Sequence, residues 1–357
     1  MKTKIKNAAR LALSKIFESG ARNKFRTGKV REGVEFFQRA LDLNDNARLD
    51  LLERIGPQPD ATMEKQFVES GEGHLLNGED QQAGKDFSAA IALSGSFTEH
   101  RNLEKTIRPL TENDNLIVTQ VAINYFPIFE IWYRNMMRLG IRNILLIALD
   151  PLAAKRAEER DIPFWYLPIF GFQKSVRRLI WTDTLKVRQK ILNLGVNYLH
   201  SDADAIWLAD ARSDVFDQRA DIVSSTALGT PQSALDAWGF VLCLGFYSVR
   251  STEYTRAMYD RYIEYTKSLG HDQNGLNQML LDYGFEWRLQ NDGFSHGSSD
   301  KLAVSVTALP QRIVARPQKL SEWSTTKVLH PVLSASTIAA KIGILKNFGI
   351  DAGDRNG

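Results

Sequence analysis

Between residues 116 and 208 the chain alternates short apolar runs with longer amphipathic segments. The runs cover residues 116–123, 143–149, 163–167 and 197–200. Apolar runs without polar alternation are typical of strands covered on both faces, and the amphipathic segments are long enough to be helices. The alternation therefore predicts an α/β domain with a mainly parallel sheet. In such sheets, ligands bind beyond the carboxyl ends of the strands.

An acidic turn follows the fourth apolar run. It reads Asp202-Ala203-Asp204 and has apolar residues on both sides. Two carboxylates at i and i+2 can reach one divalent cation as the chain turns, and Mg²⁺ or Mn²⁺ prefers such oxygen ligands together with phosphates and water. An Asp-x-Asp alone is also common in solvated acidic turns. Its position after a buried strand favours a metal site, where the cation would neutralise a diphosphate.

Further motifs follow in a fixed order. Residues 193–195 precede the acidic turn, a Gly245-Phe246 pair lies in an apolar run, Asp272-Gln273 begins an Asp-Gln-x-x-Leu-Asn motif, and His330 comes last. In this order the stretch 116–348 resembles the nucleotide-diphospho-sugar transferase family, which includes plant arabinosyl- and xylosyltransferases and α-galactosyltransferases. The resemblance implies a retaining enzyme of GT-A fold.

The resemblance also implies a metal site and a donor site. Asp202 and Asp204 would bind the metal and His330 would complete its ligands, with His296 as the rival histidine. A neutral imidazole is a suitable third ligand. Asp202 would also face the donor nucleotide. Lys186 would occupy a basic position near that donor.

Three more residues are candidates for donor binding or catalysis. Gly245 permits close approach of the backbone to a ligand or a neighbouring strand. By resemblance, Asp272 and Gln273 would position the donor sugar or stabilise positive charge at its anomeric carbon. An ordinary helix N-cap at Asp272 is the alternative. A front-face mechanism, in which the departing phosphate takes the acceptor's proton, would need no protein base.

The N-terminal part has a different pattern. Residues 28–43 and 78–93 share a glycine, a small residue at +5, a phenylalanine at +9 and an alanine at +12. They resemble tetratricopeptide half-repeats, although any two amphipathic helical hairpins could share this much. We expect a helical domain over 1–107 and a GT-A domain over 108–357. Two repeats are few for a free-standing solenoid, so residues 1–107 would brace the next domain, bind a protein partner or self-associate.

Composition bounds the cellular setting. The 357-residue chain has a net charge of +3, and its single cysteine, Cys243, excludes an internal disulfide and is expected to be buried in an apolar run. No apolar run reaches the length of a membrane span, and no secretory signal is visible, so we expect a cytoplasmic protein. Residues 1–31 carry ten basic side chains against one acid. They form either a solvated helix face or a peripheral contact with the anionic inner face of the membrane. No aromatic-plus-basic motif for nucleic acid accompanies them.

Together these features predict a metal-dependent retaining glycosyltransferase. It would move a hexose or pentose from a nucleotide-diphosphate donor, UDP-sugar by resemblance, to a glycan hydroxyl in surface polysaccharide synthesis, with Mn²⁺ or Mg²⁺ as cofactor. One alternative is a non-catalytic helical-repeat scaffold with a degenerate transferase domain. Another is a metal-dependent nucleotidyltransferase, whose usual Gly-rich, Lys-containing loop is not visible after residues 116–118.

Overall fold

The computed structural model describes residues 61–93, 102–167, 174–316, 326–331 and 337–347, with isolated positions between 15 and 39. Apart from such isolated positions, the basic stretch 1–31 and the first tetratricopeptide-like segment, 28–43, lie outside the described residues. Within the described part of the chain, no helix is both long and apolar enough to cross a membrane.

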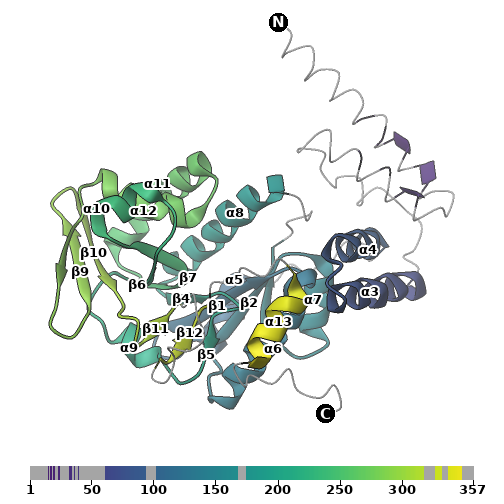
Figure 1. Cartoon of the computed structure of the whole chain (residues 1–357), viewed down its shortest axis with the longest axis horizontal. Coiled ribbons are helices and arrows are strands. Elements are labelled where there is room, and N and C mark those ends of the chain that lie inside the picture. Colours follow the sequence, from purple (N-terminus) through teal and green to yellow (C-terminus); the bar gives the residue numbers. More distant parts are fainter. Residues whose placement is uncertain are drawn as a thin grey trace, which may run out of the picture.

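A nine-stranded sheet forms the centre of the described part, in the order β3-β2-β1-β4-β7-β6-β10-β9-β8 (Figure 1). Its strands are β1 Asn115–Val121, β2 Ile144–Ala148, β3 Phe164–Tyr166, β4 Asn197–Ser201, β6 Ile222–Ala227, β7 Val241–Val249, β8 Glu286–Leu289, β9 Ser295–Ser299 and β10 Leu302–Ala308. The first four are mutually parallel, and β6 and β10 pair in parallel. The predicted α/β class with a mainly parallel sheet is confirmed.

Strand β7 departs from the expected parallel pattern. It runs antiparallel to both of its neighbours, β4 and β6. Each of its nine residues is buried, so its apolar run has the composition of a parallel strand. Burial on both faces of the strand determines this composition, and the direction of the strand does not change it.

Helices cover both faces of the sheet. On one face lie α6 Phe126–Arg138, α7 Pro151–Glu158 and α13 Ile338–Asn347, and on the other α8 Lys174–Asn193, α11 Glu253–Leu269 and α12 Asp272–Asp282. Successive side chains of a strand point to opposite faces. Accordingly Ile117 and Val121 of β1 belong to one apolar cluster, whereas Leu116 and Val118 belong to the other.

The other elements that follow residue 93 in the chain are short. They are α5 Leu103–Ile107, α9 Arg212–Phe216, α10 Gln232–Trp238, the 3₁₀ turns Arg108–Leu110 and Ile123–Tyr125, and the strands β5 Ile206–Trp207, β11 Val314–Ala315 and β12 Val328–Leu329. The last three strands form a second sheet in the order β11-β12-β5. Strand β12 pairs antiparallel with β5, which brings a late segment of the chain beside the acidic turn.

An antiparallel pair of helices precedes the sheet, α3 Ala61–Leu76 and α4 Asp80–Leu93. They approach closely at Gly71, where an added Cβ would lie 2.9 Å from the Phe87 ring. Leu75, Ala83 and Phe87 belong to the apolar cluster that also contains β1 and α6. The second tetratricopeptide-like segment is therefore helical, and it shares its core with the α/β part. The domain boundary at residue 107 stays a prediction.

Candidate active site

The acidic turn lies where β4 ends. The Asp202 amide donates to the Gly245 carbonyl at 2.7 Å, and the Ala205 amide donates to the Asp202 carbonyl at 2.9 Å. The second bond closes a tight turn at the carboxyl end of the strand, and the first joins this turn to β7; β5 follows the turn. Because β12 pairs with β5, the residue that follows β12, His330, faces this turn.

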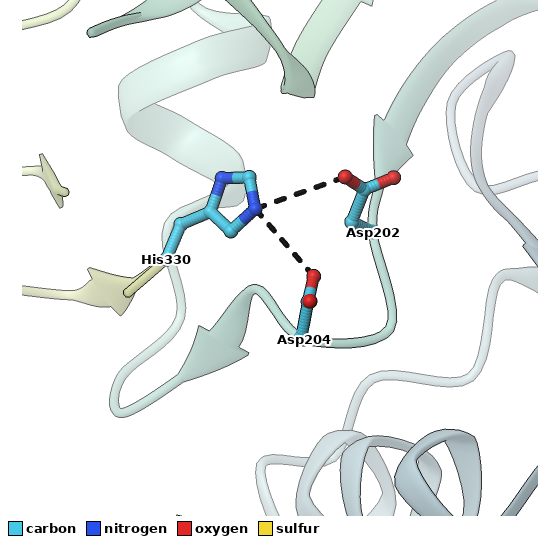
Figure 2. A group of neighbouring side chains, drawn as sticks. All are labelled: Asp202, Asp204 and His330. Atoms are coloured by element: carbon cyan, nitrogen blue, oxygen red, sulfur yellow. Dashed lines mark ion pairs between the residues drawn. The ribbon is translucent and has the colours of Figure 1, made fainter. Parts of the chain in front are cut away.

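Asp202, Asp204 and His330 converge from these two segments (Figure 2). Their ligand atoms all lie within 4.8 Å of one another. His330 Nε2 is 3.7 Å from Asp202 Oδ2 and 3.5 Å from Asp204 Oδ1. The Asp202 side chain is 39% exposed, so solvent and substrate have access from that side. Two carboxylates and an imidazole form a donor set that suits Mn²⁺ or Mg²⁺.

The three side chains form an ion-paired cluster. Burial alone would lower the pKa of His330, but Cys243 and the Asp204 carboxylate outweigh it and raise that pKa to about 10. Burial would likewise raise the pKa of Asp204, yet His330 and then Lys341 hold it well below its usual range. Without a cation, the imidazole is therefore charged. A metal at this position must displace the proton from Nε2.

This proton makes cation binding depend on pH. Since the pKa of His330 is raised to about 10, its proton competes with the cation at neutral pH, and the competition weakens as pH rises. We expect the Kd for Mn²⁺ to fall about tenfold for each unit of pH between 6.5 and 7.5, as one displaced proton requires. Calorimetry in buffers of different ionisation enthalpy should also detect release of about one proton. A Kd that does not change over this range would contradict His330 as a ligand.

The other side of the cluster is formed by a phenol and a lysine. The Tyr125 hydroxyl donates to Asp204 Oδ2 at 2.6 Å. Lys341 Nζ donates to the Tyr125 hydroxyl at 2.9 Å and lies 3.6 Å from Asp204 Oδ2. These contacts fix the orientation of the Asp204 carboxylate and leave its Oδ1 directed at His330.

Gly245 lies directly behind the cluster. A Cβ at this position would lie 2.1 Å from His330 Cε1 and 2.5 Å from Asp202 Oδ2. Two of the three side chains in the cluster therefore lie against this glycine, whereas the sequence predicted the approach of a ligand or a neighbouring strand. Cys243, two residues earlier on β7, is buried as predicted. It also has two cationic neighbours that its apolar run did not indicate, His330 and Arg316, whose charges outweigh burial and lower its pKa.

Two buried residues, His200 and Arg188, orient the Asp202 side chain. Burial, and then the Arg188 guanidinium, hold the pKa of His200 below its ordinary value, so the ring is neutral. Arg188 can only donate, and it does so to His200 Nδ1 at 3.0 Å, although the Val118 carbonyl is also near this nitrogen. The proton therefore sits on Nε2, which donates to Asp202 Oδ1 at 2.9 Å.

This support was not predicted from the sequence. Arg188 lies on α8 in line with Leu185 and Leu192, both fully buried. An arginine within the apolar stripe of an amphipathic helix was the available signal. The predicted basic residue, Lys186, is two positions away, or about 200° around the helix. It is exposed and pairs with Asp183 at 2.7 Å, so the structure does not bring it to the cluster.

Asp272 and Gln273 are the first two residues of α12, and His271, rather than Asp272, is the N-cap, so the alternative of an ordinary N-cap at Asp272 is wrong. Asp272 is buried, with Oδ2 3.9 Å from Arg188 Nη1, which links it through Arg188 and His200 to Asp202. Gln273 Nε2 donates to the Thr230 carbonyl at 2.6 Å. Its Oε1 lies 3.4 Å from the Leu244 amide, next to Gly245. The rival histidine, His296, is on β9 and bonds Thr307 at 2.8 Å, outside the cluster.

Changing His200 should weaken cation binding. We expect His200→Phe to raise the Kd for Mn²⁺ about 10- to 100-fold, since groups that orient metal ligands have effects of this size. Stability should fall by about 1–3 kcal/mol, because the buried Arg188 loses an acceptor. Calorimetry and urea unfolding measure the two effects, with His296→Phe on β9 as the control. Equal Kd values for the two variants would contradict the proposed support.

Fold and site together define an α/β protein with a candidate divalent-cation centre at the carboxyl ends of its strands, as suits a phosphate-containing substrate. The family model for nucleotide-diphospho-sugar transferases matches residues 139–337, more than half of the chain, which therefore belongs to this family. This match confirms the predicted family and its enzyme class, glycosyltransferase.

Individual relatives are more distant. Arabinosyltransferase RRA2 of Arabidopsis thaliana is 24% identical over 203 residues, 50% of this chain and 47% of that protein. The chain thus spans about half the length of this curated relative. Among solved structures, galactosyltransferase LgtC with donor and acceptor sugar analogues has a TM-score of 0.41 at 11% identity, covering 66% of this chain and 94% of that one. Glycosyltransferase GlyE of Streptococcus pneumoniae TIGR4 has a TM-score of 0.33 at 13% identity, covering 57% of this chain and 47% of that one.

Proposed function

We propose that the protein transfers a hexose or pentose from a nucleoside-diphosphate sugar, UDP-sugar first, to a glycan hydroxyl, with Mn²⁺ or Mg²⁺ bound by Asp202, Asp204 and His330. One observation carries this proposal. The three side chains converge at the strand ends although His330 is far from the acidic turn in the sequence. Family membership supports the donor class, and the name of the relative RRA2 makes a pentose donor worth testing.

The bound cation would neutralise the diphosphate and stabilise the nucleoside diphosphate as a leaving group. The chain itself supplies the positioning. His200 and Tyr125 each hold one carboxylate oxygen, so the two aspartates present their other oxygens toward His330. Because these groups are oriented before substrate arrives, little reorganisation is needed during the reaction.

We propose that Asp272 and Gln273 contribute to the sugar side of the site. Asp272 is held beside Arg188, and Gln273 is anchored to the strand segment that contains Gly245. Gln273 is thereby linked to the backbone behind the cation centre, and Asp272 is linked to Asp202 through Arg188 and His200. For a retaining reaction, the departing phosphate would accept the proton of the acceptor hydroxyl, so no carboxylate is required as a base.

The acceptor and the cellular location are also part of the proposal. A glycan acceptor in surface polysaccharide synthesis fits an enzyme that works in the cytoplasm at the inner face of the membrane. The ten basic residues of stretch 1–31 would favour an anionic surface. The scaffold alternative is less favoured, because both acids and the histidine are present and assembled.

Calorimetry of UDP with the full chain tests the proposal. With Mn²⁺ at about 1 mM, we expect UDP to bind with a Kd of about 1 μM to 1 mM, the range of typical KM values. Binding should be lost when EDTA replaces the metal. UDP-hexoses and UDP-pentoses would then be screened for release of UDP. Release of pyrophosphate from a nucleoside triphosphate would instead indicate a nucleotidyltransferase. Failure of every nucleotide to bind with metal present would indicate the scaffold.

A further inference from the structure

The start of α4, together with the turn that precedes it, contacts the start of α13. The Ile338 amide lies 3.4 Å from Asp80 Oδ1 and 3.3 Å from Asp80 Oδ2, so the Asp80 carboxylate accepts from the first helical residue of α13. Beside it, a Cβ at Gly78 would lie 3.6 Å from Thr337 Oγ1. An amide at a helix N-terminus has no partner within its own helix. Here the partner comes from another element, more than 250 residues earlier in the chain.

One turn further along, α13 reaches the candidate cation centre. The Ala340 amide donates to Thr337 Oγ1 at 3.2 Å, and the Lys341 amide donates to the Thr337 carbonyl at 3.1 Å, which together form the first turn. From there Lys341 Nζ reaches the Tyr125 hydroxyl and lies 3.6 Å from Asp204 Oδ2. Its ammonium also lies 4.9 Å from the centre of the Tyr125 ring. The position of Lys341 therefore depends on where α13 begins.

The helix pair is itself held firmly on the α/β part. Lys155 of α7 pairs with Glu64 of α3 at 2.6 Å, and Arg156 pairs with Glu72. Ile338 of α13 is buried in the same apolar cluster as Leu75 of α3. Figure 1 shows α13 next to α6, with α3 and α4 beyond α7. The helix pair thus has a defined position from which to hold α13.

We infer that the α3–α4 pair contributes to the candidate cation centre. Asp80 positions α13, and α13 in turn holds Lys341 and Tyr125 against Asp204. The inference rests on the proposed function, because it assigns the N-terminal helices a role at the same cation centre. Asp80 is a positioning residue, since it acts through α13 and touches none of the candidate ligands. The helices would serve this role without a protein partner.

Two readouts test the contact independently of any donor. We expect Asp80→Ala in the full chain to speed hydrogen exchange of the α13 amides about tenfold, because loss of the cap loosens the first turn. For the same reason, the acetylation rate of Lys341 should rise severalfold relative to that of Lys327. Asp80→Asn, which retains an acceptor, should restore most of the protection. The control is Glu69→Gln, an exposed acid of α3 paired only weakly with Lys65 at 3.9 Å. Unchanged exchange and labelling in Asp80→Ala would overturn the inference.

A double-mutant cycle tests the route through Lys341. We expect Asp80→Ala to weaken binding of UDP with Mn²⁺ about fivefold, as expected for loss of a helix cap, and to have little further effect in a Lys341→Met background. If the effects of the two substitutions on the Kd for UDP simply multiply, the residues act separately, and the proposed action of Asp80 through Lys341 is wrong. If wild-type protein fails to bind UDP, the proposed function fails. The exchange and labelling results then still decide whether Asp80 positions α13.

Discussion

Replacing Asp204 by alanine should abolish detectable Mn²⁺-dependent UDP binding and lower kcat/KM for the donor by about a thousandfold, since a metal contributes several kcal/mol of charge stabilisation. Asp204 supplies one of three converging ligand atoms, and Tyr125 and Lys341 already orient its carboxylate. Without it, His330 and Asp202 would provide only two protein ligands. Calorimetry and initial rates with the donor identified in the screen measure both effects.

Asp217→Ala is the matched control, because this acid is exposed at the end of α9 and lies outside the cluster. Its binding and rate should equal those of the wild type. Retention of UDP binding by Asp204→Ala within a few fold, with the metal still required, would show that the ligand set has been assigned wrongly. Loss of binding in both variants would point to a folding defect, which circular dichroism would detect.

Gly245→Ala should disrupt the same centre without removing any ligand. The new methyl carbon would lie 2.1 Å from His330 Cε1 and 2.5 Å from Asp202 Oδ2, so both side chains must move. We expect Mn²⁺-dependent UDP affinity to fall about a hundredfold, the upper end of effects seen for groups behind metal ligands. Stability should fall by about 1–3 kcal/mol from overpacking.

Gly73→Ala is the control for this substitution. An added Cβ at Gly73 meets no atom within 4 Å, and the residue lies within α3. Alanine there should leave UDP binding unchanged and raise stability slightly, because alanine favours helix more than glycine does. If Gly245→Ala binds UDP and Mn²⁺ as tightly as the wild type, the close approach at this glycine has no role in holding the ligands.

Much of the architecture was predictable because it depends on local patterns. The alternation of apolar runs and amphipathic segments predicted β1, α6, β2, α7, β3, α8 and β4 in order, and the ends of the four strands are close to those observed. The acidic turn was predictable for the same reason, since it directly follows a buried run. The helical form of residues 78–93 also follows from local periodicity.

The supporting residues could not be predicted in this way. Lys186 and Arg188 are both basic residues of α8, and only packing shows that the second faces the cluster whereas the first faces solvent. His200 precedes Asp202 by two residues, so the sequence shows the pair but not the hydrogen bond between them. Such assignments depend on which side of an element meets the rest of the protein.

The α/β class and the acids of the candidate site could be predicted from the sequence, because strand and helix periodicity and a carboxylate pair are properties of neighbouring residues. The family followed from a resemblance in the order of several motifs, which the family match bears out. The tertiary structure was needed to show that His330, rather than His296, completes the cluster, because that choice depends on the pairing of β12 with β5. It also decided that β7 runs antiparallel and that Asp80 meets α13. Strand direction and contacts between distant segments arise from how whole faces pack, which no local pattern records.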